Sequence, residues 1–217
     1  MWTRTAFSPA CLIAVVCLTP SIAVAQGNRP PRVQVTAGGG FLTSGAYFTG
    51  PGHLALDNSD AFTGLVQVIV PVWPFVGLVA GGAYASPTWR LSGIPLVGSI
   101  GVDGASLWFA DAAVRGEVPI RRTGSPGPTA FAQAGVGVAH FALSTAVLDR
   151  AVDGSATNLA LSLGAGLGVP LTRRVGLELL AKDYIVSFKS VHELDALGIQ
   201  GRRTHTFVLA LSARVEL

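Results

Sequence analysis

The chain has 217 residues, of which 50% are hydrophobic and only 12% are charged, and its mean hydropathy is +0.53. Soluble globular domains carry roughly 25% charged residues, so the composition favours a membrane protein. The formal net charge is only +3 and the basic residues are scattered, which excludes nucleic-acid binding as the function.

Residues 1–25 have the features of a secretory signal peptide. Arg4 provides the positive n-region, residues 6–18 form the apolar h-region, and small residues precede a cleavage site that we predict between Ala25 and Gln26. The mature protein then consists of one domain, residues 26–217.

Both cysteines, Cys11 and Cys17, lie in the segment that we expect to be removed. The mature chain therefore has no thiol for a disulfide or for nucleophilic chemistry. A lipoprotein signal at Cys17 is disfavoured, because Val16 stands where a small residue is needed.

Three uncharged stretches, 61–89, 123–148 and 154–172, are long enough to suggest transmembrane helices. Their periodicity indicates strands instead. In residues 158–169 every odd position is Leu, Ala or Val, whereas the even positions are Asn, Ala, Ser and Gly. Alternation with period two places the large aliphatic side chains on one face of a strand, and a helix would distribute them around its circumference.

The same alternation occurs in residues 108–118 and 205–217. A soluble β-sandwich also alternates, but the face opposite its core is usually rich in solvated polar residues. Here the opposing rows are small and carry few charges, which suits the narrow interior of a membrane barrel with lipid outside.

Three similar segments predict short hairpin turns with Pro at the strand end. They are "VPVWPFVGL" at 70–78, "VPIRR" at 118–122 and "VPLTRRVGL" at 169–177. Between them we expect four longer irregular loops. They are 43–60, 85–105, 143–157 and 189–204.

Seven connections require eight strands, each long enough for the 9–11 residues that cross a bilayer at a tilt. The predicted strands are 32–42, 61–70, 75–84, 106–118, 129–142, 158–169, 175–188 and 205–217. Aromatic residues at their ends predict two interfacial girdles. We place Phe62, Tyr84, Trp108, Phe141 and Phe207 at the loop side, and Trp73, Phe75 and Phe131 at the turn side.

With this pattern the chain resembles the small eight-stranded outer-membrane β-barrel proteins of the OmpA/OmpX type over residues 32–217. The resemblance implies an all-β, antiparallel up-and-down barrel in the outer membrane, with short turns and both termini in the periplasm and the long loops outside. Its partners would be outer-membrane lipid, the barrel-assembly machinery and a surface ligand of the loops. Family members usually end in an aromatic residue, where this chain has Leu217.

Seven charged residues fall on the inward rows of the predicted strands. They are Asp111, Arg115, Glu117, Glu178, Lys182, Arg214 and Glu216. Because an eight-stranded barrel is just wide enough for its own side chains, we expect these charges to pair in a structural network. Glu178 and Lys182, four apart on one strand, are expected to interact. A proton relay or gated ion path is the alternative.

Catalysis is not favoured. Barrel enzymes that remove acyl chains from lipid A use a His and a Ser two residues apart on one strand, and none of the four histidines has this spacing: His53, His140, His192 and His205. No metal-ligand spacing or phosphate-binding loop occurs, so we expect no cofactor. We therefore expect a structural or surface-interaction protein, with a lipid-A-modifying enzyme or a transporter of small apolar molecules as alternatives.

Overall fold

The computed structural model describes residues 32–45, 48–49, 55–94, 98–102, 105–120, 127–147, 150–187, 200–201 and 203–217. The predicted signal peptide with its cleavage site at Ala25 and Gln26 lies outside these ranges, as do His53 and His192. No helix in the described part of the chain is long and apolar enough to cross a membrane.

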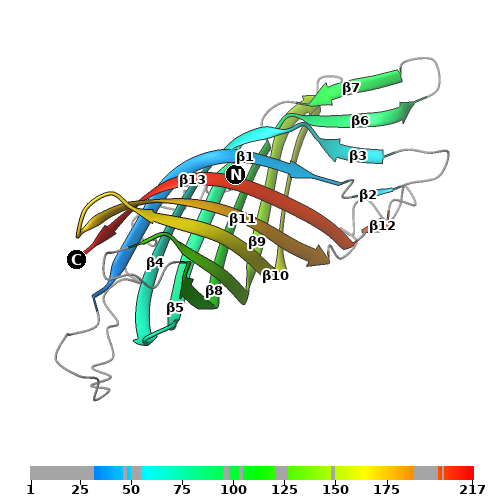
Figure 1. Ribbon diagram of the computed structural model, residues 1–217. Helices are drawn as coiled ribbons and strands as arrows, with labels where there is room; N and C mark the ends of the chain where they lie inside the picture. The colour runs from blue at the N-terminus through cyan, green and yellow to red at the C-terminus, as the bar shows by residue number, and fades with distance from the viewer. Residues whose placement is uncertain are drawn as a thin grey trace, which may run out of the picture. The chain divides into compact units, whose positions relative to one another are not determined.

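Eight antiparallel strands form a closed barrel in the order β1-β13-β11-β10-β9-β8-β5-β4 (Figure 1), which confirms the predicted fold. These strands are β1 (Gln34–Ser44), β4 (Ala61–Trp73), β5 (Val76–Ala85), β8 (Ala105–Pro119), β9 (Thr129–Val147), β10 (Arg150–Pro170), β11 (Val175–Ser187) and β13 (Arg203–Glu216). Each coincides with one of the eight predicted strands, and the ends differ by at most three residues except at the loop end of β9 and β10, which extend five and eight residues beyond the predicted bounds.

Burial alternates along each strand as the sequence rows predict. In β13 the residues Thr204, Thr206, Val208, Ala210, Ser212 and Arg214 are buried in the lumen, and every residue between them is exposed. In β10, Leu159, Leu161, Leu163 and Leu167 are 44–81% exposed. A soluble protein would not leave a continuous surface of this kind in water, so the outward rows are the lipid-facing surface.

The registers of the eight strands define the stagger of the barrel. Stepping from partner to partner once around the barrel leads from Gln34 back to Ser44 on the same strand, ten residues nearer the loop end. The path is Gln34, Ile69, Val79, Ala113, Gly135, Ser162, Tyr184, Thr206 and Ser44. A stagger of this size requires strands tilted by roughly 35–45° from the axis, and each row of registered partners therefore climbs as it passes around the barrel.

Glycine permits the close approach of β1 and β13, the first and last strands of the barrel. Gly40 is buried opposite Ala210, and a Cβ atom built on Gly40 would overlap the carbonyl oxygen of Leu209. Gly38 has the same relation to the carbonyl of Leu211. The inward glycines of this strand are therefore needed for barrel closure.

The three short turns lie at one end of the barrel. Pro71 stands at a register shift near the end of β4, and Pro119 and Pro170 are the last residues of β8 and β10, where a missing N–H costs no ladder bond. In the turn after β10, the side chain of Thr172 accepts hydrogen bonds from the backbone N–H groups of Arg174 and Val175. The turn after β8 is closed by Ile120 and Pro128, since the N–H of Ile120 donates to the Pro128 carbonyl.

The connections at the other end contain a second sheet, in the order β12-β2-β3-β6-β7 (Figure 1). Its strands are β2 (Phe48–Thr49), β3 (Ala55–Asn58), β6 (Trp89–Ile94), β7 (Gly98–Val102) and β12 (Gln200–Gly201). We expected 43–60 and 85–105 to be irregular, and this was wrong. The described parts of both segments contain short strands that pair with one another through backbone groups, and such pairing needs no apolar face.

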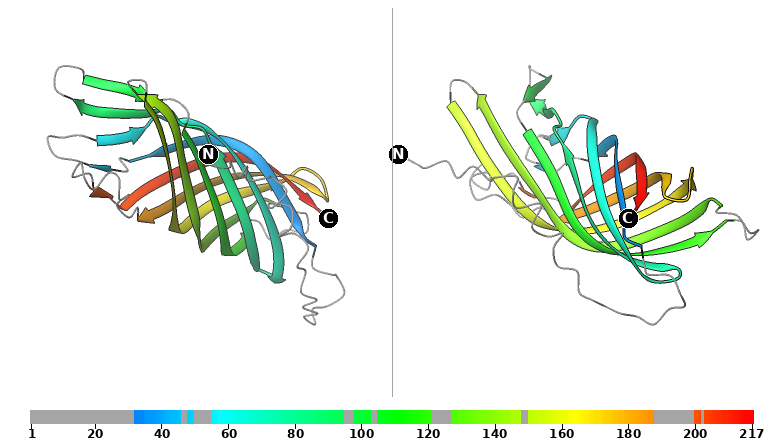
Figure 2. Two further views of the ribbon diagram at one scale, coloured as in Figure 1. Left: turned by 180° about the vertical axis from the view of Figure 1, so that it is seen from behind. Right: turned by 90° about the vertical axis from the view of Figure 1, so that its left-hand side faces the viewer.

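The predicted irregular loop at 143–157 is also wrong. Strands β9 and β10 continue to Val147 and Arg150, and their pairing extends without interruption to the Val147–Arg150 pair (Figure 2). β8 pairs with β9 only as far as Leu143, and β11 pairs with β10 only from Ala160. The polar residues of this segment reflect a hairpin that extends past its neighbours, and they do not interrupt the strands.

The aromatic girdles are confirmed in part. Phe62, Tyr84 and Phe207 at the loop side and Trp73 and Phe75 at the turn side are 43–69% exposed. Phe131 and Phe141 instead point into the lumen and are only 4% and 7% exposed. The inward row of β9 combines Phe131 and Phe141 with Gly135 and Gly137, and the outward row is mostly Ala and Val, so the larger aromatic side chains here lie on the row that also holds the glycines.

We predict that Gly40→Ala destabilises the barrel by about 1–3 kcal/mol, because the new methyl group forces β1 away from β13. Gly64→Ala is the matched control: it lies on the outward face of the neighbouring strand, and a Cβ there meets nothing within 4 Å. The control should change stability by less than about 0.5 kcal/mol. Urea unfolding of the refolded protein in detergent measures both, and equal effects would contradict the close approach.

Candidate functional site: the lumen charge network

A buried ion pair lies in the middle of the lumen. The Nζ atom of Lys182 on β11 donates to both carboxylate oxygens of Asp111 on β8, at 2.8 Å each. Ser162 donates to the same carboxylate at 2.9 Å and Tyr184 at 3.2 Å. The side chains of Lys182 and Asp111 are both 0% exposed. The carboxylate is therefore fully hydrogen-bonded, which offsets much of the cost of its burial.

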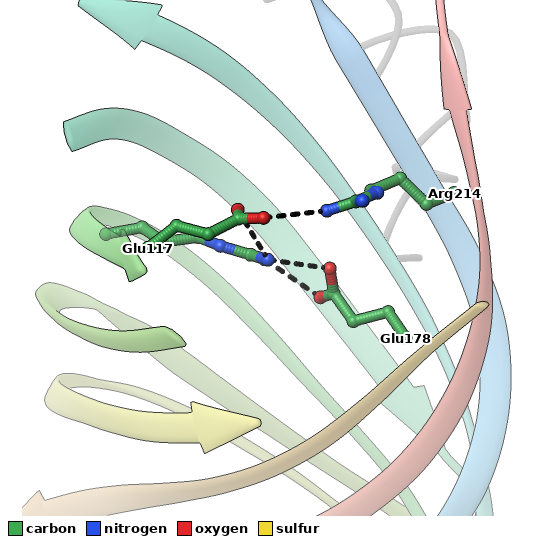
Figure 3. Close-up of polar contacts among 4 residues, drawn as sticks. Glu117, Glu178 and Arg214 are labelled. Carbon is green, nitrogen blue, oxygen red and sulfur yellow. Dashed lines mark hydrogen bonds and ion pairs between the residues drawn. The ribbon is translucent and has the colours of Figure 1, made fainter. Parts of the chain in front are cut away.

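A second cluster lies nearer the turn end. The guanidinium of Arg115 on β8 donates two hydrogen bonds to Glu178 on β11, at 2.9 and 2.8 Å, and a third to Glu117 at 3.2 Å. Arg214 on β13 approaches Glu117 from the other side at 3.1 Å. Figure 3 shows Glu117, Glu178 and Arg214 converging on this cluster. Two arginines and two glutamates thus balance in charge, with the bidentate geometry that makes such pairs strong.

Aromatic side chains support both clusters. The Arg115 guanidinium lies over the ring of Phe131, 3.4 Å from its centroid, in a cation–π contact. The ring of Tyr184 stacks on Phe109 with centroids 4.1 Å apart. These contacts hold the hydrogen-bonding ends of Arg115 and Tyr184 in place.

Both ion pairs cross the lumen. Asp111 and Arg115 stand on β8, and Lys182 and Glu178 stand on β11, and the barrel order places β9 and β10 between these two strands. Each strand contributes to these two pairs one acid and one base that are four residues apart, and the order of acid and base along the barrel axis is opposite on the two strands. Opposite charges therefore meet only when β8 and β11 have the relative position along the barrel axis that the structure shows.

Apolar side chains fill the lumen on the loop side of Lys182 and Asp111. All are at most 7% exposed: Leu42, Ala83, Ala85, Leu107, Phe109, Ala139, Phe141, Ala160, Val186 and Val208. We name this group the apolar plug. Water and ions would have to pass these side chains to travel along the axis, and an apolar constriction opposes that passage.

The structure brings together six of the seven charged residues predicted to face the lumen, and it separates the seventh. Glu216 lies at the turn-end rim with its side chain 29% exposed, and the nearest cation is Arg32 at 3.9 Å. The expected partnership of Glu178 with Lys182 is wrong, since each pairs with a residue of β8. Residues four apart on a strand are about 13 Å apart along it, so partners across the lumen are closer.

Sequence reasoning did not assign Ser162, Tyr184 or Phe131 to the site. Ser162 and Tyr184 lie an even number of residues from the other inward residues of their strands, so the sequence could predict that their side chains point into the lumen. Their contact with Asp111 depends on the stagger of the barrel, which no local pattern encodes.

The two histidines within the described residues lie on the outward face near the loop end. The Nδ1 atom of His205 is 2.7 Å from a carboxylate oxygen of Asp183, and Nδ1 of His140 is 2.7 Å from the hydroxyl of Thr157. The ring of His140 also stacks on Trp108. In the described part of the chain no three potential metal ligands come together.

Solved structures show the same fold. Neisserial surface protein A matches with a TM-score of 0.59 and 12% identity, covering 85% of this chain and 97% of that one. The outer membrane protein OprG from Pseudomonas aeruginosa matches with a TM-score of 0.58 and 10% identity, covering 89% and 99%. No family model and no curated protein sequence matches the chain. At these identities the likeness shows the fold alone.

The closed antiparallel barrel, its lipid-facing outer rows and these structural matches define the class of protein. The chain has the closed eight-stranded antiparallel barrel fold of small outer-membrane proteins.

We predict that Lys182→Met destabilises the barrel by about 3–5 kcal/mol, because it leaves the buried Asp111 carboxylate without its cation. Adding Asp111→Asn should recover much of the loss, since the stranded charge is then gone. The control is Glu178→Gln combined with Lys182→Met, whose effects should add, because Glu178 pairs with Arg115. Urea unfolding in detergent measures all variants, and recovery only in the control pair would refute the observed partners.

Proposed function

We propose that this protein is a closed barrel that anchors a recognition surface in the outer membrane, with the loop-end sheet as the part that meets a surface ligand. The packed lumen carries this proposal, because its side chains leave the barrel no role as an open pore.

The burial of the lumen residues supports the closed barrel. The side chains of Arg115 and Glu178 are each 1% exposed, and those of Lys182 and Asp111 are 0% exposed. Open channels in membrane barrels are associated with wider barrels of sixteen or more strands. An eight-stranded barrel with two ion-pair layers and the apolar plug has no comparable space.

The architecture of the loop end supports the recognition role. The loops of this end build a five-stranded sheet and the extended β9–β10 hairpin, and at the opposite end the connections after β4 and β10 are two and four residues long. Binding residues are commonly carried on loops that a rigid scaffold positions, and the barrel provides such a scaffold.

We predict that the purified protein gives no stepwise ion conductance in planar bilayers, because the apolar plug and both ion-pair layers block the axis. Lipid A from cells that express it should have the same mass spectrum as lipid A from cells without it. If the wild type conducts ions and Lys182→Met abolishes that conductance, the protein is a channel and the closed-barrel proposal is wrong. A change in the number of acyl chains on lipid A would instead show that the protein is a lipid-A-modifying enzyme.

We also predict that protease added to intact cells cleaves within 85–105 or 189–204 and spares 119–128, because long loops of such barrels face outward. Permeabilised cells are the control, in which the turns become accessible as well. Cleavage of intact cells at 119–128 alone would place the loop-end sheet in the periplasm and refute the recognition role.

A further inference from the structure

Two glutamines in the lumen have no hydrogen-bond partner among the described residues. Gln67 on β4 is 1% exposed and Gln133 on β9 is 4% exposed, and within the described ranges neither the oxygen nor the nitrogen of either amide has a partner. In the same part of the chain, the hydroxyls of Thr36 and Ser212 and the Nε atom of Arg115 are buried and unpartnered as well. Buried polar groups in folded proteins almost always have a partner, either from the protein or from ordered water, so these groups require one.

Gln133 lies on a row of register partners that joins the two ion-pair clusters. Arg115 of β8, Gln133 of β9, Gly164 of β10 and Lys182 of β11 are successive register partners. A Cβ atom built on Gly164 would lie 3.0 Å from Cγ of Gln133 and 3.3 Å from its Nε2 atom, so the glutamine side chain extends across the glycine toward β11. Its amide therefore stands between Arg115 of one cluster and Lys182 of the other.

A second row of register partners joins the clusters around the other side of the lumen. It contains Asp111 of β8, Gly81 of β5, Gln67 of β4, Thr36 of β1 and Arg214 of β13. A Cβ atom built on Gly81 would lie 3.1 Å from Cγ of Gln67 and 3.4 Å from its Nε2 atom, so this glutamine also extends across a glycine. On both sides of the lumen, the two clusters are thus separated by a buried amide that has no partner among the described residues.

The groups around these amides decide which ligand fits. Nζ of Lys182 carries three N–H groups, and within the described residues its hydrogen bonds go only to Asp111. Nε of Arg115 is also a donor, whereas the amide of Gln133 needs both a donor and an acceptor. An anion would leave the amide oxygens unpartnered, and a cation would be repelled by Lys182 and Arg115. Internal water makes about three hydrogen bonds as donor and acceptor together, so water satisfies the whole set.

We propose that ordered water molecules occupy the lumen between the two ion-pair clusters, where the amides of Gln67 and Gln133 bind them. Through this water the Lys182–Asp111 pair and the Arg115–Glu178 cluster form one hydrogen-bonded network. The apolar plug closes this layer toward the loop end, so the bound water does not make the barrel a pore. The proposal concerns the lumen alone and is independent of the surface-ligand proposal.

The test is nuclear magnetic resonance of the predicted mature chain, residues 26–217, refolded in detergent micelles with isotope-labelled glutamine. The side-chain NH₂ groups of Gln67 and Gln133 should show cross-peaks to water whose laboratory-frame and rotating-frame Overhauser effects have opposite signs. Opposite signs are the signature of long-lived contact with bound water, and proton exchange gives the same sign in both. The absence of such contact at both amides would overturn the proposal.

Leu180 and Leu107 provide a matched pair of methyl groups, because both side chains are 0% exposed. Cδ1 of Leu180 is 3.3 Å from the Cβ position built on Gly164, as is Nε2 of Gln133, so it lies beside the proposed water. Leu107 belongs to the apolar plug. The Leu180 methyls should show water cross-peaks and the Leu107 methyls none. Cross-peaks at both leucines, or at neither, would contradict water confined to this layer.

Gln133→Met keeps the length of the side chain and removes the amide, so it should abolish the water contacts of the Leu180 methyls and of Arg115 Nε–H. Gln34→Met makes the same replacement at the turn end of β1, outside both rows, and should leave these contacts unchanged. Contacts that persist in Gln133→Met, or that disappear equally in both variants, would refute the amide as the binding group. The comparison of Leu180 with Leu107 uses the wild type, so it decides the proposal even if Gln133→Met does not fold.

Discussion

The two ion pairs between β8 and β11 are the constraint on which the rest of the structure depends. Asp111 with Lys182 and Arg115 with Glu178 join strands that share no backbone hydrogen bond, and the order of charges is reversed from one strand to the other. A slip by four residues would bring Asp111 to Glu178, or Arg115 to Lys182, and bury like charges together. The network therefore specifies the stagger of the barrel, a role better attested for buried charges than net stabilisation.

This stagger has opposite effects on the two faces of the same strands. Inside, it brings Ser162 and Tyr184 to Asp111 and leaves little room elsewhere, so glycines face the lumen wherever backbones approach closely. Outside, it inclines each row of register partners to the membrane. Lumen packing and lipid contact are consequently set by one geometric quantity, although they share no side chains.

The sequence predicted the strands because their alternation is local: each leucine row between 158 and 169 identifies its own face. It also predicted which charged side chains face inward, because every second side chain of a strand points to the same face. It could not predict partners across the lumen, because the meeting of Asp111 with Lys182 depends on the registers of three intervening strand pairs. The loops at 43–60 and 143–157 were misjudged for a related reason. Outside the membrane a strand has no lipid-facing row, so polarity and glycine content no longer distinguish strands from irregular loops.

The seam between β1 and β13 joins residues that lie far apart in the sequence, such as Gln34 with Glu216. Contacts of such long sequence separation carry the largest loop-closure entropy and form slowly, so we expect this seam to be the last part of the barrel to form. Gly38 and Gly40 place no inward side chains in its path. Closure at these two positions is thereby a contact between backbones, and the inward side chains that β1 adds to the lumen come from residues such as Thr36 and Leu42, both 0% exposed.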